Sequence, residues 1–135
     1  MSAPRVLVME DDPSVRGLLH TLLTSEGYDV VVAADGLAGL QNAREQRPAL
    51  ILLDVMMPDL GGVRVLEEMH ADPALADVTV LVLTGRTEIL GGLADRVGAD
   101  NVFAKPFAVE ELLARVGQVT GGPPDLDLDT IRLPE

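Results

Sequence analysis

Short apolar runs alternate with amphipathic segments along residues 5–120, and this alternation constrains the fold more than any other feature. The runs lie at residues 5–9, 28–34, 50–53, 78–83 and 101–104. Apolar residues at consecutive positions are typical of strands that are buried on both faces. Such strands, separated by helices, predict a parallel sheet covered on both sides. Right-handed crossovers then make a doubly wound α/β fold with five strands and five helices.

The segments between the runs carry apolar residues at helical spacing. The expected helices lie at 13–26, 37–47, 63–69, 89–97 and 109–116. Asp12-Pro13 is typical of an N-cap followed by proline at the first helical position, and Gly27 ends that helix. Gly91-Gly92 lies near the start of the fourth helix, where each glycine costs roughly 0.5–1 kcal/mol relative to alanine. We therefore expect that start to be frayed.

Charge and cysteine content exclude several classes of protein. Acids outnumber bases 22 to 10 and the net charge is −12, so repulsion argues against direct binding to nucleic acid or to an anionic membrane. Cysteine is absent, which excludes disulfides, thiolate metal sites and a cysteine nucleophile. No apolar run reaches the roughly 18 residues of a membrane helix, and no basic and apolar leader opens the sequence. We expect a cytoplasmic protein.

Four of the five expected strands end in polar residues that bear chemistry: Glu10-Asp11-Asp12, Asp54, Thr84 and Lys105. In an open parallel sheet, ligands bind outside the carboxyl ends of the strands. Clustered carboxylates repel one another unless a proton or a cation bridges them, and an oxygen-only ligand set suits Mg²⁺. The sequence therefore predicts a magnesium site at this edge.

Asp54 and Lys105 are the two most informative of these residues. Asp54 follows the apolar run 50–53, where ionisation costs the most, so it is interpreted as a metal ligand, a nucleophile or both. Lys105 is the only lysine in a chain with nine arginines, and a compact ammonium can bind a phosphoryl oxygen. The Thr84 hydroxyl is read either as an ordinary strand residue or as a donor to such a group.

These strand ends resemble the receiver domain of bacterial two-component response regulators over about residues 4–120. The resemblance rests on four motifs in the same order: Val6–Asp12, Ile51–Pro58, Leu83–Gly85 and Lys105–Phe107. It implies a flavodoxin-like sheet with strand order 2-1-3-4-5. It also implies a signalling domain rather than an enzyme, assisting only its own phosphorylation and dephosphorylation.

The resemblance further implies that Asp54 accepts a phosphoryl group from a sensor histidine kinase or a phosphotransfer protein. By position, Glu10 and Asp11 would hold Mg²⁺ together with Asp54 and the backbone carbonyl of Met56. Lys105 and Thr84 would contact the phosphoryl group, with Thr84 as the switch hydroxyl, and Gly62 matches the glycine after the phosphoacceptor loop. The surface of the last two expected helices and the strand between them would then signal to an effector protein or domain, or form a phosphorylation-dependent homodimer.

The strand before Lys105 departs from the family pattern at one position. Three residues before the lysine, where the family usually has an aromatic side chain, this sequence has Val102, and Phe103 follows it. Phe103 is read either as a core residue or as a displaced signalling residue. Met56 and Arg86 occupy positions that affect phosphoryl loss in the family.

Two other classes of protein lack residues that they need. A phosphatase of the haloacid dehalogenase type needs a second aspartate where Met56 stands, and a flavin-binding module needs a phosphate loop where Glu10-Asp11-Asp12 stands. The sequence therefore disfavours both classes.

Residues 121–135 are interpreted as an acidic, Pro- and Gly-rich tail or linker. The open alternatives are a stand-alone receiver and the receiver part of a longer, DNA-binding transcriptional regulator.

Overall fold

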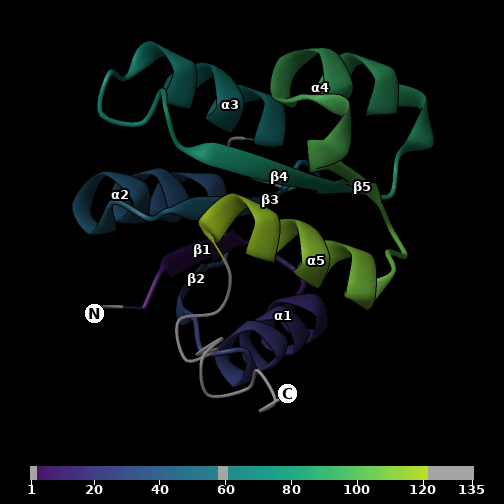
Figure 1. The fold of residues 1–135 in the computed structure, drawn as a ribbon. Coiled ribbons are helices and arrows are strands. Elements are labelled where there is room, and N and C mark those ends of the chain that lie inside the picture. Colours follow the sequence, from purple (N-terminus) through teal and green to yellow (C-terminus); the bar gives the residue numbers. More distant parts are fainter. Residues whose placement is uncertain (1–2, 58–60, 122–135) are drawn as a thin grey trace.

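The computed structural model describes residues 3–57 and 61–121 and contains a five-stranded parallel sheet with order β2-β1-β3-β4-β5 (Figure 1). The strands are β1 (Arg5–Met9), β2 (Asp29–Ala33), β3 (Leu50–Asp54), β4 (Thr79–Thr84) and β5 (Val102–Ala104). The α-helices are α1 (Pro13–Ser25), α2 (Gly36–Gln46), α3 (Gly62–Ala71), α4 (Leu90–Val97) and α5 (Val109–Thr120). The doubly wound fold and the strand order predicted from the sequence are both confirmed.

Two apolar cores lie on the two faces of the sheet. Alternation of side chains along β1 sends Leu7 and Met9 to one face and Val6 and Val8 to the other. The first face is covered by α2, α3 and α4, and the second by α1 and α5 (Figure 1). Every residue of β3 is buried, because this strand lies in the middle of the sheet with helices on both sides.

Two helices, α1 and α2, begin with an aspartate cap, and the sequence indicated the first of them. The Asp12 carboxylate accepts hydrogen bonds from the backbone N–H groups of Ser14 and Val15, and Pro13 is the first residue of α1. Asp35 caps α2 in the same manner, with 2.8 Å between its Oδ1 and the backbone nitrogen of Ala38. The sequence indicated only a turn at Asp35, so this cap was missed.

A 3₁₀-helix at Thr87–Ile89 directly precedes the fourth helix, α4. No side-chain hydrogen bond caps the start of α4, and the same holds for α3 and α5. Fraying of Gly91 and Gly92 is a dynamic property and stays a prediction. A second 3₁₀-helix, Ala99–Asn101, replaces the beginning of the expected fifth strand, which is therefore shorter than predicted.

The last described residue, Gly121, directly follows the final helix. α5 ends at Thr120 and is followed by Gly121, whose φ of 86° is a left-handed conformation that suits glycine. The predicted tail or linker, apart from Gly121, lies outside the described residues. Within the part of the chain that the structure describes, none of the helices has the length and apolar composition needed to cross a membrane.

Candidate functional site

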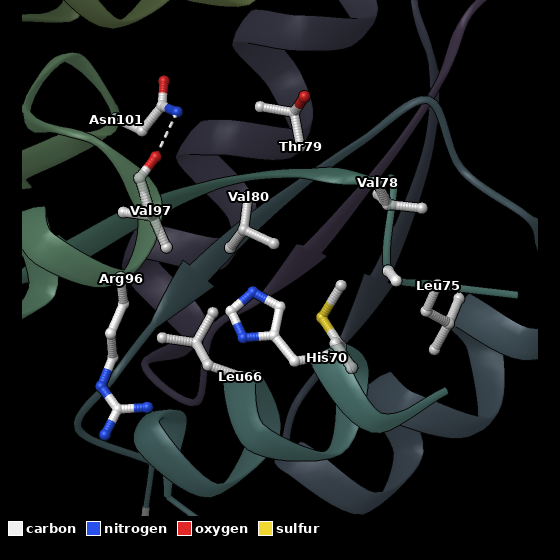
Figure 2. Close-up of a pocket in the computed structure, with 11 residues that line it drawn as sticks. Leu66, His70, Leu75, Val78, Thr79, Val80, Arg96, Val97 and Asn101 are labelled. Atoms are coloured by element: carbon white, nitrogen blue, oxygen red, sulfur yellow. Dashed lines mark hydrogen bonds between the residues drawn. The ribbon is translucent and has the colours of Figure 1, made fainter. Parts of the chain in front are cut away.

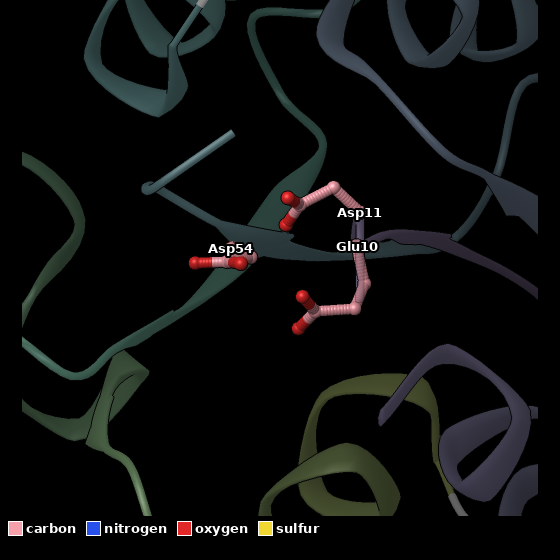
Figure 3. A group of neighbouring side chains, drawn as sticks. All are labelled: Glu10, Asp11 and Asp54. Carbon is pink, nitrogen blue, oxygen red and sulfur yellow. The ribbon is translucent and has the colours of Figure 1, made fainter. Parts of the chain in front are cut away.

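Three carboxylates meet at the carboxyl ends of β1 and β3, which are neighbours in the sheet. Glu10 and Asp11 directly follow β1, and Asp54 is the last residue of β3. One carboxylate oxygen from each residue lies within 4.8 Å of the other two (Figure 3). Parallel pairing of the two strands therefore brings together the acids that the sequence predicted to share a site.

Asp54 is held on both sides of its carboxylate. It is only 3% exposed, and its Oδ1 accepts a hydrogen bond of 3.0 Å from the backbone N–H of Met56. Its Oδ2 lies 3.3 Å from the Lys105 Nζ. A carboxylate with one amide donor and one ammonium as partners is fixed in orientation and remains an acceptor at its outer lone pairs.

Lys105 comes from the end of β5, which is separated from β3 and the acidic group by β4. The residue follows β5, and its backbone N–H donates to the Thr84 carbonyl at the end of β4. Its ammonium donates to Glu10 Oε1 over 2.7 Å, and Glu10 is fully buried. One cation thus bridges two buried carboxylates, which offsets part of their mutual repulsion.

The pKa values of these three groups are shifted in different directions. Burial raises the pKa of Glu10 from 4.5 to about 7, and a hydrogen bond with Asp54 acts in the same direction. Burial also raises the pKa of Asp54, but its hydrogen bonds with Glu10 and the Met56 amide, and the charge of Lys105, outweigh burial and hold that pKa below its usual value. Burial lowers the pKa of Lys105, but its contacts with both carboxylates outweigh this and raise the pKa overall. The carboxylate pair therefore takes up a proton near neutral pH unless a cation replaces it.

These donors fit a divalent cation that prefers oxygen. The three carboxylates face one another, and Asp11 is only partly buried, so the group combines two buried acids with one that solvent reaches. A bound Mg²⁺ needs one or two carboxylates and keeps several waters, which a half-open acidic group of this size allows. The two histidines, His20 on α1 and His70 on α3, lie outside the group and on exposed positions.

Thr84, the last residue of β4, is buried, and its hydroxyl is hydrogen-bonded to a backbone amide. Its Oγ1 accepts a hydrogen bond of 3.0 Å from the backbone N–H of Arg86. The Arg86 guanidinium forms an exposed ion pair with Glu88 at 2.9 Å. The Thr84 hydroxyl is thus bonded to the Arg86 backbone, and the Arg86 side chain is paired with Glu88. The sequence predicted both Thr84 and Arg86 as site residues.

The loop after Asp54 requires glycine where the family motif has one. A β-carbon built on Gly62 would overlap with the backbone of Val55, so a larger residue cannot begin α3 without moving this loop. The Gly62 N–H also donates to the Val55 carbonyl over 3.0 Å. In the loop between Val55 and Gly62, Met56 is 46% exposed and Met57 is buried.

Val102 and Phe103 lie on opposite faces of the sheet. Val102 packs against the core under α2, α3 and α4, whereas Phe103 packs against the core under α1 and α5. Successive side chains of a strand point to opposite faces, so Phe103 cannot replace an aromatic side chain at position 102. Of the two readings of Phe103, its placement favours the core residue.

Arg16 is a residue of this site that the sequence interpretation missed. Its guanidinium donates to the backbone carbonyls of Glu10 and Asp11, over 2.9 and 3.1 Å. The hydrogen bonds fix the loop that carries the two acids. An arginine one turn into the helix that follows an acidic loop was the available signal.

An apolar groove of about 420 Å³ adjoins Lys105. It is lined by α1, by the loop between β5 and α5, which includes Lys105, and by the first residue of α5. The residues that make it apolar are Val15, Leu18, Pro106, Phe107 and Val109. Leu18 is 48% exposed, so part of the apolar surface of this groove is open to solvent.

Known proteins match this chain along most of its length. The family model described as the response regulator receiver domain matches residues 6–117. The chain is 42% identical to the DNA-binding dual master transcriptional regulator RpaA of Synechocystis over 84% of the chain and 47% of RpaA. It is 40% identical to the DNA-binding response regulator MtrA of Mycolicibacterium smegmatis over 83% of the chain and 48% of MtrA. The chain thus spans about half the length of these relatives.

A solved structure agrees with this match in its fold. The receiver domain of the sensor histidine kinase PA1611 of Pseudomonas aeruginosa, solved with a magnesium ion coordinated in its active site cleft, superposes with a TM-score of 0.77. The two chains are 29% identical, and the match covers 90% of this chain and 100% of that one. The chain described here therefore belongs to the response regulator receiver domain family and is the receiver domain of a two-component response regulator.

Proposed function

We propose that Asp54 accepts a phosphoryl group from the phosphohistidine of a sensor histidine kinase or phosphotransfer protein. The single observation that supports this most is the position of Asp54, a buried carboxylate in contact with Lys105 and beside two further acids. In the transfer, an Asp54 carboxylate oxygen attacks phosphorus and the bond between phosphorus and the donor nitrogen breaks. The bonding electrons stay on the imidazole, and Asp54 becomes an acyl phosphate.

The remaining residues position charge for this step. The proposed Mg²⁺ ligands are Glu10, Asp11, Asp54 and the Met56 carbonyl. When bound, the ion neutralises charge on the phosphoryl oxygens and on the carboxylates. Lys105 supplies a second positive charge, because it can turn its ammonium from Glu10 toward the phosphoryl group.

Thr84 is proposed to report the phosphoryl group to the rest of the domain. Its hydroxyl would leave the Arg86 amide and donate to a phosphoryl oxygen, which adds charge and acceptor oxygens at the end of β4. Because α4 follows β4, this exchange would bias the surface of α4, β5 and α5. Val102 takes the place of the usual aromatic partner, so repacking of a smaller side chain would accompany the switch.

The groove beside Lys105 is the proposed docking surface for the phosphodonor protein. A donor histidine must reach Asp54 from outside, and the exposed side chain of Leu18 offers apolar surface next to that path. The proposed location of the domain is the cytoplasm, where ATP-consuming kinases act. The domain itself is not proposed to bind nucleic acid, because its net charge of −12 repels phosphates.

A second candidate concerns the output. The relatives RpaA and MtrA are DNA-binding regulators, and the match covers about half of each. This favours the alternative in which the chain is the receiver part, about residues 4–120, of a longer transcriptional regulator, with residues 121–135 as its linker. The stand-alone alternative signals through an effector protein or through a phosphorylation-dependent homodimer.

The proposed chemistry is tested by incubating the protein with acetyl phosphate and Mg²⁺ and measuring the intact mass. We expect the mass of one phosphoryl group to be added to the wild type and to Asp77→Asn, which changes an exposed acid away from the site. Asp54→Asn should remain unmodified. An unmodified wild type, or modification that persists in Asp54→Asn, would contradict the proposal.

A further inference from the structure

The Arg16 side chain is bonded to the backbone of the acidic loop and not to an acid. Its Nη1 donates to the Glu10 carbonyl over 2.9 Å and to the Asp11 carbonyl over 3.1 Å. Within the residues that the structure describes, Arg16 forms no ion pair. Its charge is therefore directed at two peptide groups, and hydrogen bonds from a charged donor are stronger than neutral ones.

Most of the other described arginines pair with carboxylates instead: Arg5, Arg44, Arg64, Arg86 and Arg96. Arg96, for example, lines a cavity of about 170 Å³ between α3, α4 and β4 (Figure 2), and it is exposed and paired with Glu67 at 4.0 Å. Exposed pairs of this kind contribute little to stability. Arg16 is half-buried, and its partners are two carbonyls of a single loop.

The place of Arg16 in α1 opposes the helix dipole. Pro13 is the first residue of α1, and the Arg16 backbone N–H donates to the Asp12 carbonyl over 2.9 Å, so Arg16 lies one turn into the helix. A positive charge near a helix N-terminus is unfavourable, because the backbone N–H groups there already carry partial positive charge. The contacts with the two loop carbonyls offset this cost.

The peptide group between Asp11 and Asp12 connects Arg16 to the Glu10 carboxylate. This peptide is trans, so its C=O and N–H point in opposite directions. The Asp11 carbonyl accepts from Arg16. The N–H of the same peptide, which belongs to Asp12, donates to Glu10 Oε2 over 3.2 Å. The other Glu10 oxygen accepts from Lys105 over 2.7 Å, so both oxygens of this buried carboxylate are held.

We propose that Arg16 is a positioning residue for the metal site, an inference that rests on the proposed function. By holding the two carbonyls, Arg16 sets the direction of the Glu10 carboxylate and the course of the backbone that carries Asp11. Oxygens of these two acids lie within 4.8 Å of each other and of an Asp54 oxygen. Mg²⁺ demands near-ideal octahedral geometry, so a loop that is free to turn would bind the ion less tightly.

This role predicts an effect opposite in sign to that of the charge alone. Arg16 is a cation in contact with the loop that carries two of the proposed metal ligands, so its charge by itself repels Mg²⁺. If the charge were its main influence, removing Arg16 would tighten Mg²⁺ binding. If positioning is its main influence, removing Arg16 loosens the loop and weakens binding. The direction of the change in Mg²⁺ affinity therefore separates the two roles.

The test measures the Mg²⁺ dissociation constant of the unphosphorylated chain by backbone amide NMR during titration with MgCl₂. Arg16→Met keeps much of the aliphatic stem but has no donor. We expect it to raise the dissociation constant about tenfold, which corresponds to the loss of one charge-assisted hydrogen bond. Arg16→Lys restores a charged donor and should bind Mg²⁺ more tightly than Arg16→Met does.

Arg47→Met is the matched control. It removes the same charge from an exposed arginine that lies between α2 and β3, at the edge of the sheet opposite the acidic group. This variant should bind Mg²⁺ as tightly as the wild type. Should Arg16→Met fail to fold in urea denaturation, Arg16→Gln, whose side chain is too short to span both carbonyls, takes its place in the same comparison.

A second measurement follows the Asp12 amide in the absence of Mg²⁺. Without Arg16 the peptide is free to turn, so the Asp12 N–H should exchange with solvent faster in Arg16→Met than in the wild type. An unchanged or lower Mg²⁺ dissociation constant in Arg16→Met, an Asp12 amide that exchanges as in the wild type, or a lysine variant no better than the methionine variant would overturn the inference. A wild type that binds no Mg²⁺ would overturn it as well.

The acetyl phosphate experiment distinguishes this inference from the proposed function. Normal modification of Asp54 together with unchanged Mg²⁺ affinity in Arg16→Met would contradict the role of Arg16 alone. Weakened Mg²⁺ binding in Arg16→Met together with an unmodified wild type would contradict phosphoryl transfer to Asp54 and leave the role of Arg16 supported.

Discussion

Lys105 lies closer to Glu10 than to Asp54: its ammonium is 2.7 Å from a Glu10 oxygen and 3.3 Å from an Asp54 oxygen. Because Glu10 is fully buried and also carries a raised pKa, it is the group that most needs the cation in this state. The lysine is therefore held by an acid that is not the proposed phosphoacceptor. Transfer of a phosphoryl group to Asp54 would give Lys105 a stronger anionic partner.

Replacing Lys105 should destabilise the domain. Lys105→Met keeps much of the side-chain length but leaves the buried carboxylates of Glu10 and Asp54 without their cation. We expect a loss of about 1–3 kcal/mol in the free energy of unfolding, less than for a fully buried pair because Lys105 is 23% exposed. Urea denaturation without Mg²⁺ measures this. Arg64→Gln, which breaks an exposed pair, should change stability little, and equal losses in the two variants would refute the expectation.

The stability of the metal-free domain should fall as the pH rises through neutrality. The folded pKa of Glu10, about 7, lies above its ordinary value of 4.5, so folding favours the protonated acid. This contribution is complete below pH 4.5 and is lost as the pH passes about 7, with a total of at most about 3 kcal/mol.

The measurement is urea unfolding in EDTA between pH 5 and 8. Glu10→Gln should show a flatter profile, because it cannot ionise. The lowered pKa of Asp54 acts in the opposite sense, but its contribution is lost only as the pH falls below the ordinary value of 3.8, outside this range. A wild-type profile parallel to that of Glu10→Gln would contradict the raised pKa.

Mg²⁺ should stabilise the folded domain by relieving repulsion among the three carboxylates. At ten times the dissociation constant the expected gain is about 1.4 kcal/mol. Thermal unfolding with and without Mg²⁺ gives the value. Asp11→Asn removes a carboxylate from the group and should reduce the gain, whereas Asp12→Asn keeps an N-cap outside the group and should not. A gain that is the same in both variants would exclude the proposed metal site.

The apolar groove can be tested by comparing two phosphodonors. Leu18→Asp places a charge on an exposed position of α1 and should slow transfer from a phosphohistidine protein by at least about tenfold, while leaving transfer from acetyl phosphate unchanged. Leu37→Asp is the control, since Leu37 is an exposed leucine of α2 that does not line the groove. Equal slowing with both donors would place the effect at Asp54 instead of at docking.

Alanine at the two glycines of α4 should stabilise the domain. β-Carbons built on Gly91 and Gly92 have no atom within 4 Å, so alanine fits at either position. Each substitution should add about 0.4–1 kcal/mol by restricting the unfolded chain and favouring the helix. Hydrogen exchange of α4 amides should slow, and exchange in the wild type as slow as in α1 would contradict the expected fraying.

Much of the fold and of the acidic site could be predicted from the local pattern of apolar and polar residues in the sequence. Doubly apolar runs predicted parallel strands, and residues directly after them had to meet at one edge, because every strand of a parallel sheet points the same way. That reasoning placed Glu10, Asp11, Asp54 and Lys105 together. The fifth strand was predicted one residue too long, because the 3₁₀-helix at Ala99–Asn101 was missed, and the capping role of Asp35 was missed as well. Both depend on hydrogen bonds that the periodicity of the sequence does not reveal.

The sequence by itself determined which residues share the site, since strand direction and chain order leave few other arrangements. Only the tertiary structure decided their pairings: Lys105 with Glu10, the Thr84 hydroxyl with the Arg86 amide, and Arg16 with the acidic loop. These pairings depend on differences of a few tenths of an ångström in the distances between groups, and on burial that makes one partner more costly to leave unpaired than another. The cavity beside Arg96 has the same origin, because it exists only where α3, α4 and β4 pack together.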